Sequence, residues 1–351
     1  MNVDRVQTAP TDRNGHCITS VREFLIIYGG YDGWSFTMNN ELWSYNTISG
    51  IWKWYQPPME TANACFASTI CSVENIVYIF GGSYSPYSVL STNSLVAFDI
   101  TNATWRTLSP HIEDYDHNSP PPMYGSLIFY HKESLYILGG FYNFNYFDSM
   151  YKFSLKTYTW SLVIQKGQKP FMDYRIFGTV FNNRFFTFGT SRTGTNRFRD
   201  ITIFDFSTNT WTTRATSSKT QMYPDDDRKR ESLTFSRNFG YLSGGMSSTT
   251  HHSDMWKIDL ETLEWFKLDY SLKTCIFNHC MSVVDDFYLF SFGGMGHHPD
   301  RLNKLQKFII RPPTLYRLCL ESISRSPNMR IYAKSLPVAI ANELNFNRNS
   351  S

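Results

Sequence analysis

Pairs of glycines recur at a nearly constant interval along this chain of 351 residues. Each pair ends a short apolar run, such as VYIFGG at residues 77–82, and a tryptophan follows 21 to 24 positions after the first glycine in most copies. The first glycines are separated by 52, 58, 50, 55 and 49 residues and lie at Gly29, Gly81, Gly139, Gly189, Gly244 and Gly293. The tryptophans that follow are Trp52, Trp105, Trp160, Trp211 and Trp265. One unit is therefore repeated six times, which predicts a repeat architecture.

Each copy predicts four short strands: one before the apolar run, the run itself, an amphipathic segment such as NSLVAFDI, and the tryptophan segment. A single four-stranded sheet cannot bury both of its faces, but sheets stacked as blades around an axis bury them against each other. Glycines suit the strand end where neighbouring blades crowd together, and a tryptophan fills the space between blades. The predicted fold class is therefore all-β, a six-bladed propeller.

The repeat resembles that of the kelch family over roughly residues 3 to 310. The predicted blades cover about residues 13–56, 62–108, 122–164, 173–214, 229–268 and 276–310. Two copies are irregular, because Thr190 replaces a second glycine and the last copy has no tryptophan. We expect residues 4–8 to supply the missing outer strand of the last blade and close the ring, since open strand edges invite aggregation. Residues 1–310 would then form the propeller, and residues 311–351 a separate helical segment.

Composition limits the possible partners and environments. The net charge of +3 is too small to indicate a nucleic-acid or membrane partner. The chain has no apolar stretch long enough to span a membrane, and its first residues lack the apolar core of a secretory signal. Its six cysteines show no CxxC spacing, so reduced thiols are expected, in the cytoplasm or the nucleus.

The repeat ends before Pro312-Pro313, a pair that favours extended backbone followed by the start of a helix. Thr314 is the predicted N-cap of this helix, and Ser326 lies at its predicted end. A second short helix is expected over residues 336–344. The chain therefore changes from a β repeat to a short helical segment.

The first of these helices carries small, apolar and thiol side chains, several of them near one helical face: Thr314, Leu315, Leu318, Cys319 and Ile323. Their spacing resembles the BC-box helix that docks on Elongin C, where a leucine and a small residue enter a groove of the partner. Leu336-Pro337 resembles the Leu-Pro motif of a cullin-2 box. The resemblance implies Elongin B/C and cullin-2 as partners. The alternative is a helix that only caps its own propeller.

A propeller followed by such a box, with segments such as DRNGHC and FNHCMSVV, resembles the kelch-repeat substrate receptors of cullin-2–Elongin B/C ubiquitin ligases. This resemblance implies that the propeller binds the free C-termini of substrate proteins, commonly ending in glycine. A terminal carboxylate is best held by a bidentate arginine beside hydroxyls or amides. The candidates, taken from the starts of blades, are Arg13, Tyr124, Tyr174, Arg175, Arg228 and Asn278. Arg175 is the first choice, with a salt bridge at the rim as its alternative role.

The chain is expected to act as an adaptor and not as an enzyme. No phosphate loop, GxSxG elbow or HExxH helix occurs, and no cofactor is expected. His251-His252 and His297-His298 are adjacent pairs, and consecutive side chains on an extended strand point to opposite faces, so a shared metal is not expected. Two alternatives stay open: a cytoskeletal or signalling kelch scaffold, and an enzyme with a metal at the centre of the ring.

Overall fold

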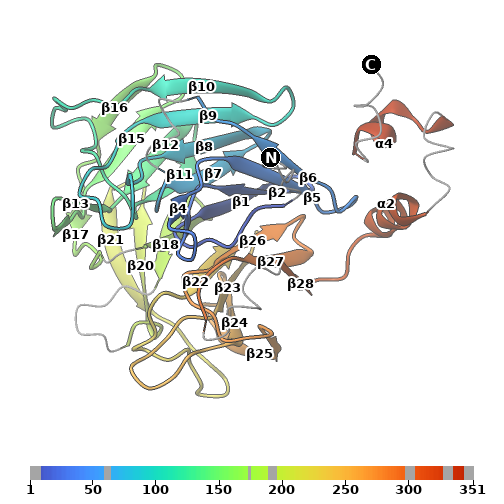
Figure 1. Cartoon of the computed structure of the whole chain (residues 1–351). Helices are drawn as coiled ribbons and strands as arrows, with labels where there is room; N and C mark the ends of the chain where they lie inside the picture. Colours follow the sequence, from blue (N-terminus) through green and yellow to red (C-terminus); the bar gives the residue numbers. More distant parts are fainter. Residues whose placement is uncertain are drawn as a thin grey trace.

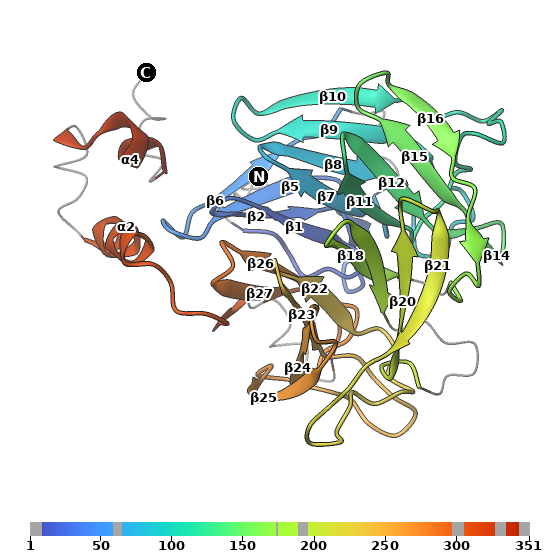
Figure 2. The same ribbon diagram turned by 180° about the vertical axis from the view of Figure 1, so that it is seen from behind.

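The computed structural model describes residues 9–58, 65–172, 175–188, 196–296, 305–326 and 335–343. Six sheets surround a central channel, and two short helices lie to one side of the ring, next to the first and last blades (Figure 1). The view from behind shows the same ring of sheets with the helices again outside it (Figure 2). The protein is therefore an all-β six-bladed propeller with a short helical extension.

The strands of each blade follow one another outward from the channel. The first three blades contain β1 (Cys17–Val21), β2 (Phe24–Tyr28), β5 (Leu42–Asn46) and β6 (Trp52–Tyr55); β7 (Thr69–Val73), β8 (Ile76–Phe80), β9 (Leu95–Asp99) and β10 (Thr104–Ser109); and β11 (Leu127–His131), β12 (Ser134–Leu138), β15 (Met150–Ser154) and β16 (Thr159–Leu162). The fourth and fifth contain β18 (Phe177–Phe181), β19 (Arg184–Phe188), β20 (Asp200–Asp205) and β21 (Thr210–Ala215), and β22 (Ser232–Phe235), β23 (Phe239–Ser243), β24 (Asp254–Asp259) and β25 (Trp265–Ser271).

The sixth blade contains β26 (Cys280–Val284), β27 (Tyr288–Phe292) and β28 (Gln306–Ile309). Three smaller additions complete the strands: β17 (Lys166–Gly167), which pairs with β21, and two hairpins formed by β3 (Tyr31–Asp32) with β4 (Thr37–Met38) and by β13 (Phe141–Tyr142) with β14 (Asn145–Tyr146). The apolar run of each repeat forms the second strand of its blade, as the sequence predicts.

The glycine pairs lie where neighbouring blades approach most closely. A Cβ atom on Gly29 would lie 2.2 Å from the carbonyl oxygen of Cys65 in the next blade, and one on Gly81 would lie 2.5 Å from that of Met123. The second glycine of these two pairs bonds to the same carbonyl: Gly30 N donates to Cys65 O at 3.1 Å, and Gly82 N donates to Met123 O at 2.9 Å. The predicted reason for these glycines, crowding between blades, is confirmed.

The tryptophans join adjacent blades through both their rings and their N–H groups. Trp160 Nε1 in the third blade donates to Ser109 Oγ in the second at 3.0 Å. Trp265 Nε1 in the fifth blade donates to the carbonyl of Phe198, which precedes β20 in the fourth, at 2.8 Å. Each indole thus fills space between blades while its polar group is satisfied.

The described residues close the ring between the sixth and first blades. Gly294 N donates to Arg13 O at 3.0 Å, and Ser20 Oγ donates to Val283 O at 2.6 Å. Inner strands β1 and β26 contact each other, and an apolar cluster that includes Leu25 joins the two blades as similar clusters join the others. The predicted closing strand, residues 4–8, lies outside the described residues, as does the irregular Gly189-Thr190 site.

The helical segment contains α2 (Leu315–Arg325) and α4 (Val338–Glu343). Thr314 Oγ1 accepts a hydrogen bond from Arg317 N at 3.2 Å, so the predicted N-cap is confirmed, and Ser326 is the C-cap. The second helix lies within the predicted range 336–344. In the part of the chain that the structure describes, neither helix has the length and apolar character to cross a membrane.

The ring has two distinct faces, because the strands alternate in direction in every blade. The face that we call the glycine face carries the glycine pairs and the lead-in segments that precede the inner strands. The opposite face, the hairpin face, carries the turns between the first and second strands and between the third and fourth strands of each blade. Helix α2 contacts Ile48 and Asp285, which lie in two such turns, so it packs on the hairpin face.

Candidate functional site

The six lead-in segments share one backbone geometry. The residue two positions before each inner strand has left-handed backbone, with φ between 53° and 68°. These residues, in blade order, are Gly15, Ala67, Gly125, Arg175, Arg230 and Asn278. Hydrogen bonds link several of them around the mouth of the channel, including Ala67 N to Gly15 O at 2.7 Å and Asn278 N to Arg230 O at 2.8 Å. The first three blades thus place small residues at this mouth, and the last three place long polar ones.

A depression of about 490 Å³ lies over the channel mouth on the glycine face. Aromatic side chains of the second and third blades form one wall: Phe66, Tyr87, Tyr124, Phe141 and Tyr146. Polar side chains of the last three blades form the other wall: Arg175, Arg230 and Asn278. The depression therefore combines positive charge, an amide and apolar area, which are the groups needed to bind a peptide end.

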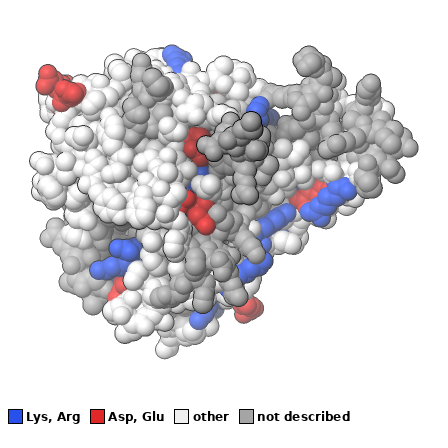
Figure 3. Space-filling model, in the orientation of Figure 1, with Lys and Arg blue, Asp and Glu red and all other residues white. Residues whose placement is uncertain are grey.

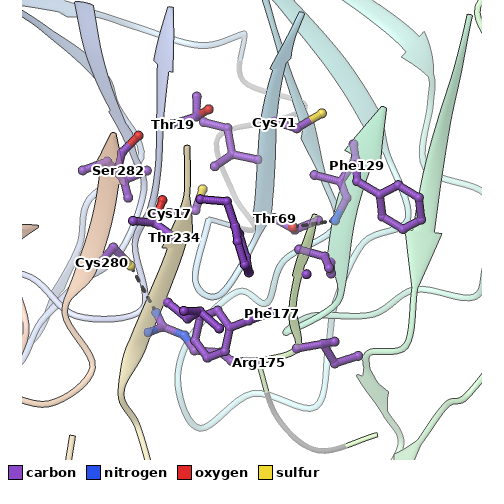
Figure 4. Close-up of a pocket in the computed structure, with 18 of the residues that line it drawn as sticks. Cys17, Thr19, Thr69, Cys71, Phe129, Arg175, Phe177, Thr234, Cys280 and Ser282 are labelled. Carbon is purple, nitrogen blue, oxygen red and sulfur yellow. Dashed lines mark hydrogen bonds between the residues drawn. The ribbon is translucent and has the colours of Figure 1, made fainter. Parts of the chain in front are cut away.

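Arg175 lies where the depression meets the channel. Its guanidinium reaches across the ring, donating from Nη2 to His16 O at 3.3 Å and from Nη1 to His279 O at 3.5 Å. Nη2 also contacts Cys280 Sγ at 3.7 Å, the interaction drawn in Figure 4. Arg175 has the left-handed backbone that all six lead-in segments share, a conformation that is unfavourable for a residue with a side chain.

Arg13 and Arg228 occupy equivalent places in the first and fifth blades, and both lie away from the depression. Arg13 is only 1% exposed, and its Nη2 pairs with Glu41 Oε1 at 2.8 Å. Arg228, also 1% exposed, pairs with Asp254 at 2.8 Å. Each carboxylate additionally accepts a bond from the indole of the tryptophan two residues later. These ion pairs hold the third strands to the lead-in segments, so we leave both arginines out of the site.

The structure brings three of the sequence candidates together in the depression: Tyr124, Arg175 and Asn278. Tyr174 lies outside the described residues. The sequence analysis missed Arg230, Asn14 and the members of the aromatic wall other than Tyr124. Aligning the six lead-in segments by sequence places Arg230 and Asn278 in the same column as Arg175, a signal that could have found Arg230.

The exposed face of α2 carries most of the predicted docking residues. Leu315 is 76% exposed and Leu318 is 46% exposed, and Cys319 is exposed as well. Ile323 is half-buried, in a small cluster with Leu320, Ile48, Leu336 and Ile340. The N-cap Thr314 precedes this face, and Pro337 lies next to Leu336 at the start of α4. Three apolar side chains of α2 thus face solvent while Leu320 attaches the helix to the propeller.

A buried charge network fixes α2 across the seam between the sixth and first blades. Arg317 pairs with Asp285 of the sixth blade, donates to Thr47 Oγ1 of the first, and donates from Nε to Glu321 Oε1 at 3.0 Å. Lys307 of β28 lies 3.6 Å from Glu321. Although burial opposes it, hydrogen bonding from Tyr288 and Arg317 holds the pKa of Glu321 below its ordinary value. The helix therefore has a defined position on the ring.

Comparison with known proteins assigns the repeat. Residues 2–115 and 67–294 match the family described as the KLHDC2/KLHL20/DRC7 Kelch-repeats domain. The chain belongs to the kelch-repeat family. Kelch domain-containing protein 10 of Rattus norvegicus is 23% identical to it over 337 residues, covering 91% of this chain and 81% of the relative. The Homo sapiens protein of that name is also 23% identical, with 91% and 75% covered.

A second kind of relative supports the same assignment. Kelch domain-containing protein 2 of Bos taurus is 24% identical over 360 residues, covering 90% of this chain and 85% of the relative. The descriptions of the family and of these relatives name kelch domains and no enzymatic activity. This kelch-repeat protein is therefore similar to kelch domain-containing protein 10 over nearly its whole length.

The channel of this kelch-repeat protein has a volume of about 520 Å³ and is lined by all six inner strands, with thiols and hydroxyls facing it (Figure 4). Burial raises the pKa of the Cys71 and Cys280 thiols, which are thus poor nucleophiles. Burial and the charge of Arg175 lower the pKa of His279 to about 3, so this imidazole is neutral at pH 7. Within the described ranges, no group of three or more His, Cys, Asp and Glu side chains could hold a metal ion.

The surface charges of this kelch-repeat protein do not gather into one large patch on the face seen in Figure 3. Uncharged residues predominate there among those described, and Lys, Arg, Asp and Glu occur in small groups. The positive charge of the depression itself comes from two side chains, Arg175 and Arg230.

Proposed function

We propose that this protein is the substrate-recognition adaptor of a cullin-2–Elongin B/C ubiquitin ligase, working in the cytoplasm or the nucleus. The observation that carries the proposal is the position of α2, which exposes Leu315, Leu318 and Cys319 although the helix is fixed to the ring. A helix that served only as a cap would turn its apolar side chains inward. Elongin C would bind the exposed face of α2, and Leu336-Pro337 would contribute to the choice of cullin-2 as the cullin partner.

The depression on the glycine face would bind the C-terminal tail of a substrate. Arg175 and Arg230 supply the positive charge that a terminal carboxylate requires, and Asn278 supplies an amide that can fix its orientation. The bonds of Arg175 to the backbone oxygens of His16 and His279 have a charged donor but uncharged acceptors, and a terminal carboxylate would add the opposite charge.

The two proposed sites lie on opposite faces of one ring. The depression opens on the glycine face, whereas α2 packs on the turns of the hairpin face. A substrate tail and Elongin could therefore bind at the same time without competing for surface. The adaptor would raise the effective concentration of substrate lysines near the conjugating enzyme, and the chemistry would occur on other subunits.

Co-purification with Elongin B/C tests the docking half of this proposal. The double variant Leu315→Ser, Cys319→Lys should lose the association, because both side chains lie on the exposed face of α2. Thr208→Lys is the matched control, since it adds the same charge at an exposed position in the β20–β21 turn of the fourth blade, on the same face of the ring but away from α2. The proposal fails if the double variant binds Elongin B/C as well as the wild-type protein does.

A second candidate function, a kelch scaffold without ligase partners, is favoured by one observation. Leu320 is buried against Ile48, and Arg317 joins the first and sixth blades, so α2 also supports the ring. Truncation after Ile310 would then lower the stability of the propeller, and no Elongin would co-purify with the full chain. Elongin binding separates the two functions, because stabilisation of the ring is compatible with both.

A further inference from the structure

Exposed aromatic residues gather at the loops of the first three blades, around the depression. We call these residues the aromatic rim: Trp34, Phe36, Tyr87, Phe144 and Tyr146. Trp34 and Phe36 belong to the loop of the β3–β4 hairpin, and Phe144 and Tyr146 belong to the β13–β14 hairpin. Tyr87 and Tyr146 also line the depression, so the rim and the depression are continuous.

Two rim residues combine exposure with backbone strain. Phe36 is 75% exposed at φ 56°, and Phe144 is 76% exposed at φ 64°. Left-handed backbone disfavours bulky side chains, and glycine or asparagine is usual at such hairpin positions. Neither phenylalanine gains burial in return. Left-handed backbone also occurs at Tyr158 on the hairpin face, so the indication of a binding role comes from the exposure of both phenylalanine rings in hairpins that adjoin the depression.

The hairpins that carry the rim are held in place by local contacts. Asp32 Oδ1 accepts a bond from Trp34 N at 2.9 Å, and Asp32 Oδ2 accepts one from Ser35 Oγ at 2.7 Å. In the third blade, the ring of Phe141 packs edge-on against Tyr124 at 5.4 Å and against Tyr146 at 4.9 Å. The rim is therefore a preorganised surface, which lowers the entropic cost of binding.

Among the residues that the structure describes, the aromatic rim lies on one side of the depression. The corresponding loop of the fifth blade carries small polar residues instead: Ser247, Ser248, Thr249 and Thr250. A tail held at its end by the arginine wall would thus meet these aromatic side chains as it leaves over the first three blades. This asymmetry orients the bound peptide, with its C-terminus at the arginine wall and its upstream residues over the aromatic rim.

We propose that the aromatic rim binds aromatic or large aliphatic side chains of the substrate tail, a few residues upstream of its terminal carboxylate. This inference rests on the proposed function of the depression and adds the class of tail that it selects. The depression binds the C-terminal end of the substrate tail, and the rim binds apolar side chains in the segment that precedes this end. Charge complementarity with the arginine wall and continuity with the depression identify the occupant as the same peptide.

An array of random peptides with free C-termini tests the rim. Tails selected by the wild-type protein should be enriched in Trp, Phe, Tyr, Leu and Ile upstream of the terminal residues. The double variant Phe36→Gly, Phe144→Gly should lose this enrichment and bind the selected apolar tails about 3- to 10-fold more weakly. It should keep the same preference at the terminal residue. Its melting temperature should stay the same or rise, because glycine relieves the strained backbone.

Tyr158→Gly is the matched control for binding, since Tyr158 is a left-handed aromatic residue on the hairpin face. It should leave the selection of tails unchanged. Selection of tails without upstream apolar enrichment, or the same enrichment in the double phenylalanine variant, overturns the inference and leaves the proposed function standing. Failure of every free C-terminus to bind the wild-type protein overturns both. Loss of all binding in Arg175→Ala together with the rim effect supports both.

Discussion

Arg175 has a backbone conformation that glycine adopts at the same place in the first and third blades. Left-handed backbone costs a residue with a side chain roughly 1–2 kcal/mol, and Arg175 adopts it at φ 62°. Its guanidinium lies at the meeting point of the depression and the channel, in contact with the carbonyls of His16 and His279. Both bonds run from the charged guanidinium to uncharged backbone oxygens, so the carboxylate of the proposed ligand would add an ion pair that they lack.

Replacing Arg175 with glycine should separate binding from folding. We expect the free energy of unfolding to change by less than about 1 kcal/mol, because relief of strain offsets the lost hydrogen bonds. Binding of free C-terminal tails should weaken at least about tenfold. Urea unfolding and fluorescence polarisation measure the two effects. Arg22→Gly, at a left-handed arginine on the hairpin face, is the control and should leave binding intact.

The buried histidines predict how stability depends on pH. Burial lowers the pKa of His279 to about 3, and burial together with nearby positive charge lowers that of His16. The unfolded chain binds these protons below about pH 6.5 and the folded chain does not, so stability is full above pH 6.5 and falls as the pH drops towards 3. Between pH 7 and pH 5 the loss should be on the order of 1–2 kcal/mol per histidine.

Urea unfolding at the two pH values checks this dependence. His279→Gln should reduce the pH dependence by about half, because one of the two sealed imidazoles is removed. His117→Gln, at an exposed histidine, should leave it unchanged. An unaltered pH dependence of stability in His279→Gln would contradict the prediction that His279 stays unprotonated in the folded protein between pH 7 and pH 5.

The elements of this protein differ in how far the sequence predicts them. The period of the glycines and tryptophans predicts the four strands of each blade, because each repeat has to bury the same two faces. The ion pair of Arg13 with Glu41 joins residues 28 positions apart, and nothing local in the sequence distinguishes this arginine from a ligand-binding one. The apolar side chains of α2 are likewise ambiguous, since only contact with Ile48 reveals that Leu320 faces inward.

Helix α2 should depend on Arg317 for its attachment. Arg317→Ala leaves Glu321 buried without its closest partner and removes the bonds to Thr47 and Asp285. Breaking a buried pair costs up to about 3–5 kcal/mol, and partial exposure of Asp285 reduces this to about 2–3 kcal/mol. Hydrogen exchange should therefore speed up about 30-fold or more in the amides of residues 315–325, with little change in β2 or β12. Unchanged protection in α2 would contradict the proposed anchor.

At the scale of the whole molecule, an apolar cluster joins the neighbouring blades at each of the six seams, and the seam between the sixth and first blades carries α2 as well. Strand β28 is the outermost strand of the sixth blade in the described residues, whereas the other five blades have at least four strands. The sequence prediction that residues 4–8 complete this blade stays a prediction. If this prediction holds, the first residues of the chain form the outer strand of the sixth blade and help to close the ring.

Deleting residues 1–8 should therefore lower the melting temperature by at least about 3 °C and increase aggregation, since the edge of β28 would be uncovered. Deleting residues 344–351 is the size-matched control. Differential scanning calorimetry and light scattering measure both effects. Equal melting temperatures for the two deletions would mean that the ring closes without the N-terminal strand.

The central claim is that one ring carries a substrate site and a ligase site on opposite faces. Size-exclusion chromatography of the full chain with Elongin B/C and a labelled peptide chosen from the free C-terminus array tests it most directly. The account predicts one complex containing all three, with the affinity for the peptide unchanged by Elongin B/C. Displacement of the peptide by Elongin B/C, or elution of Elongin B/C apart from the protein, would contradict it.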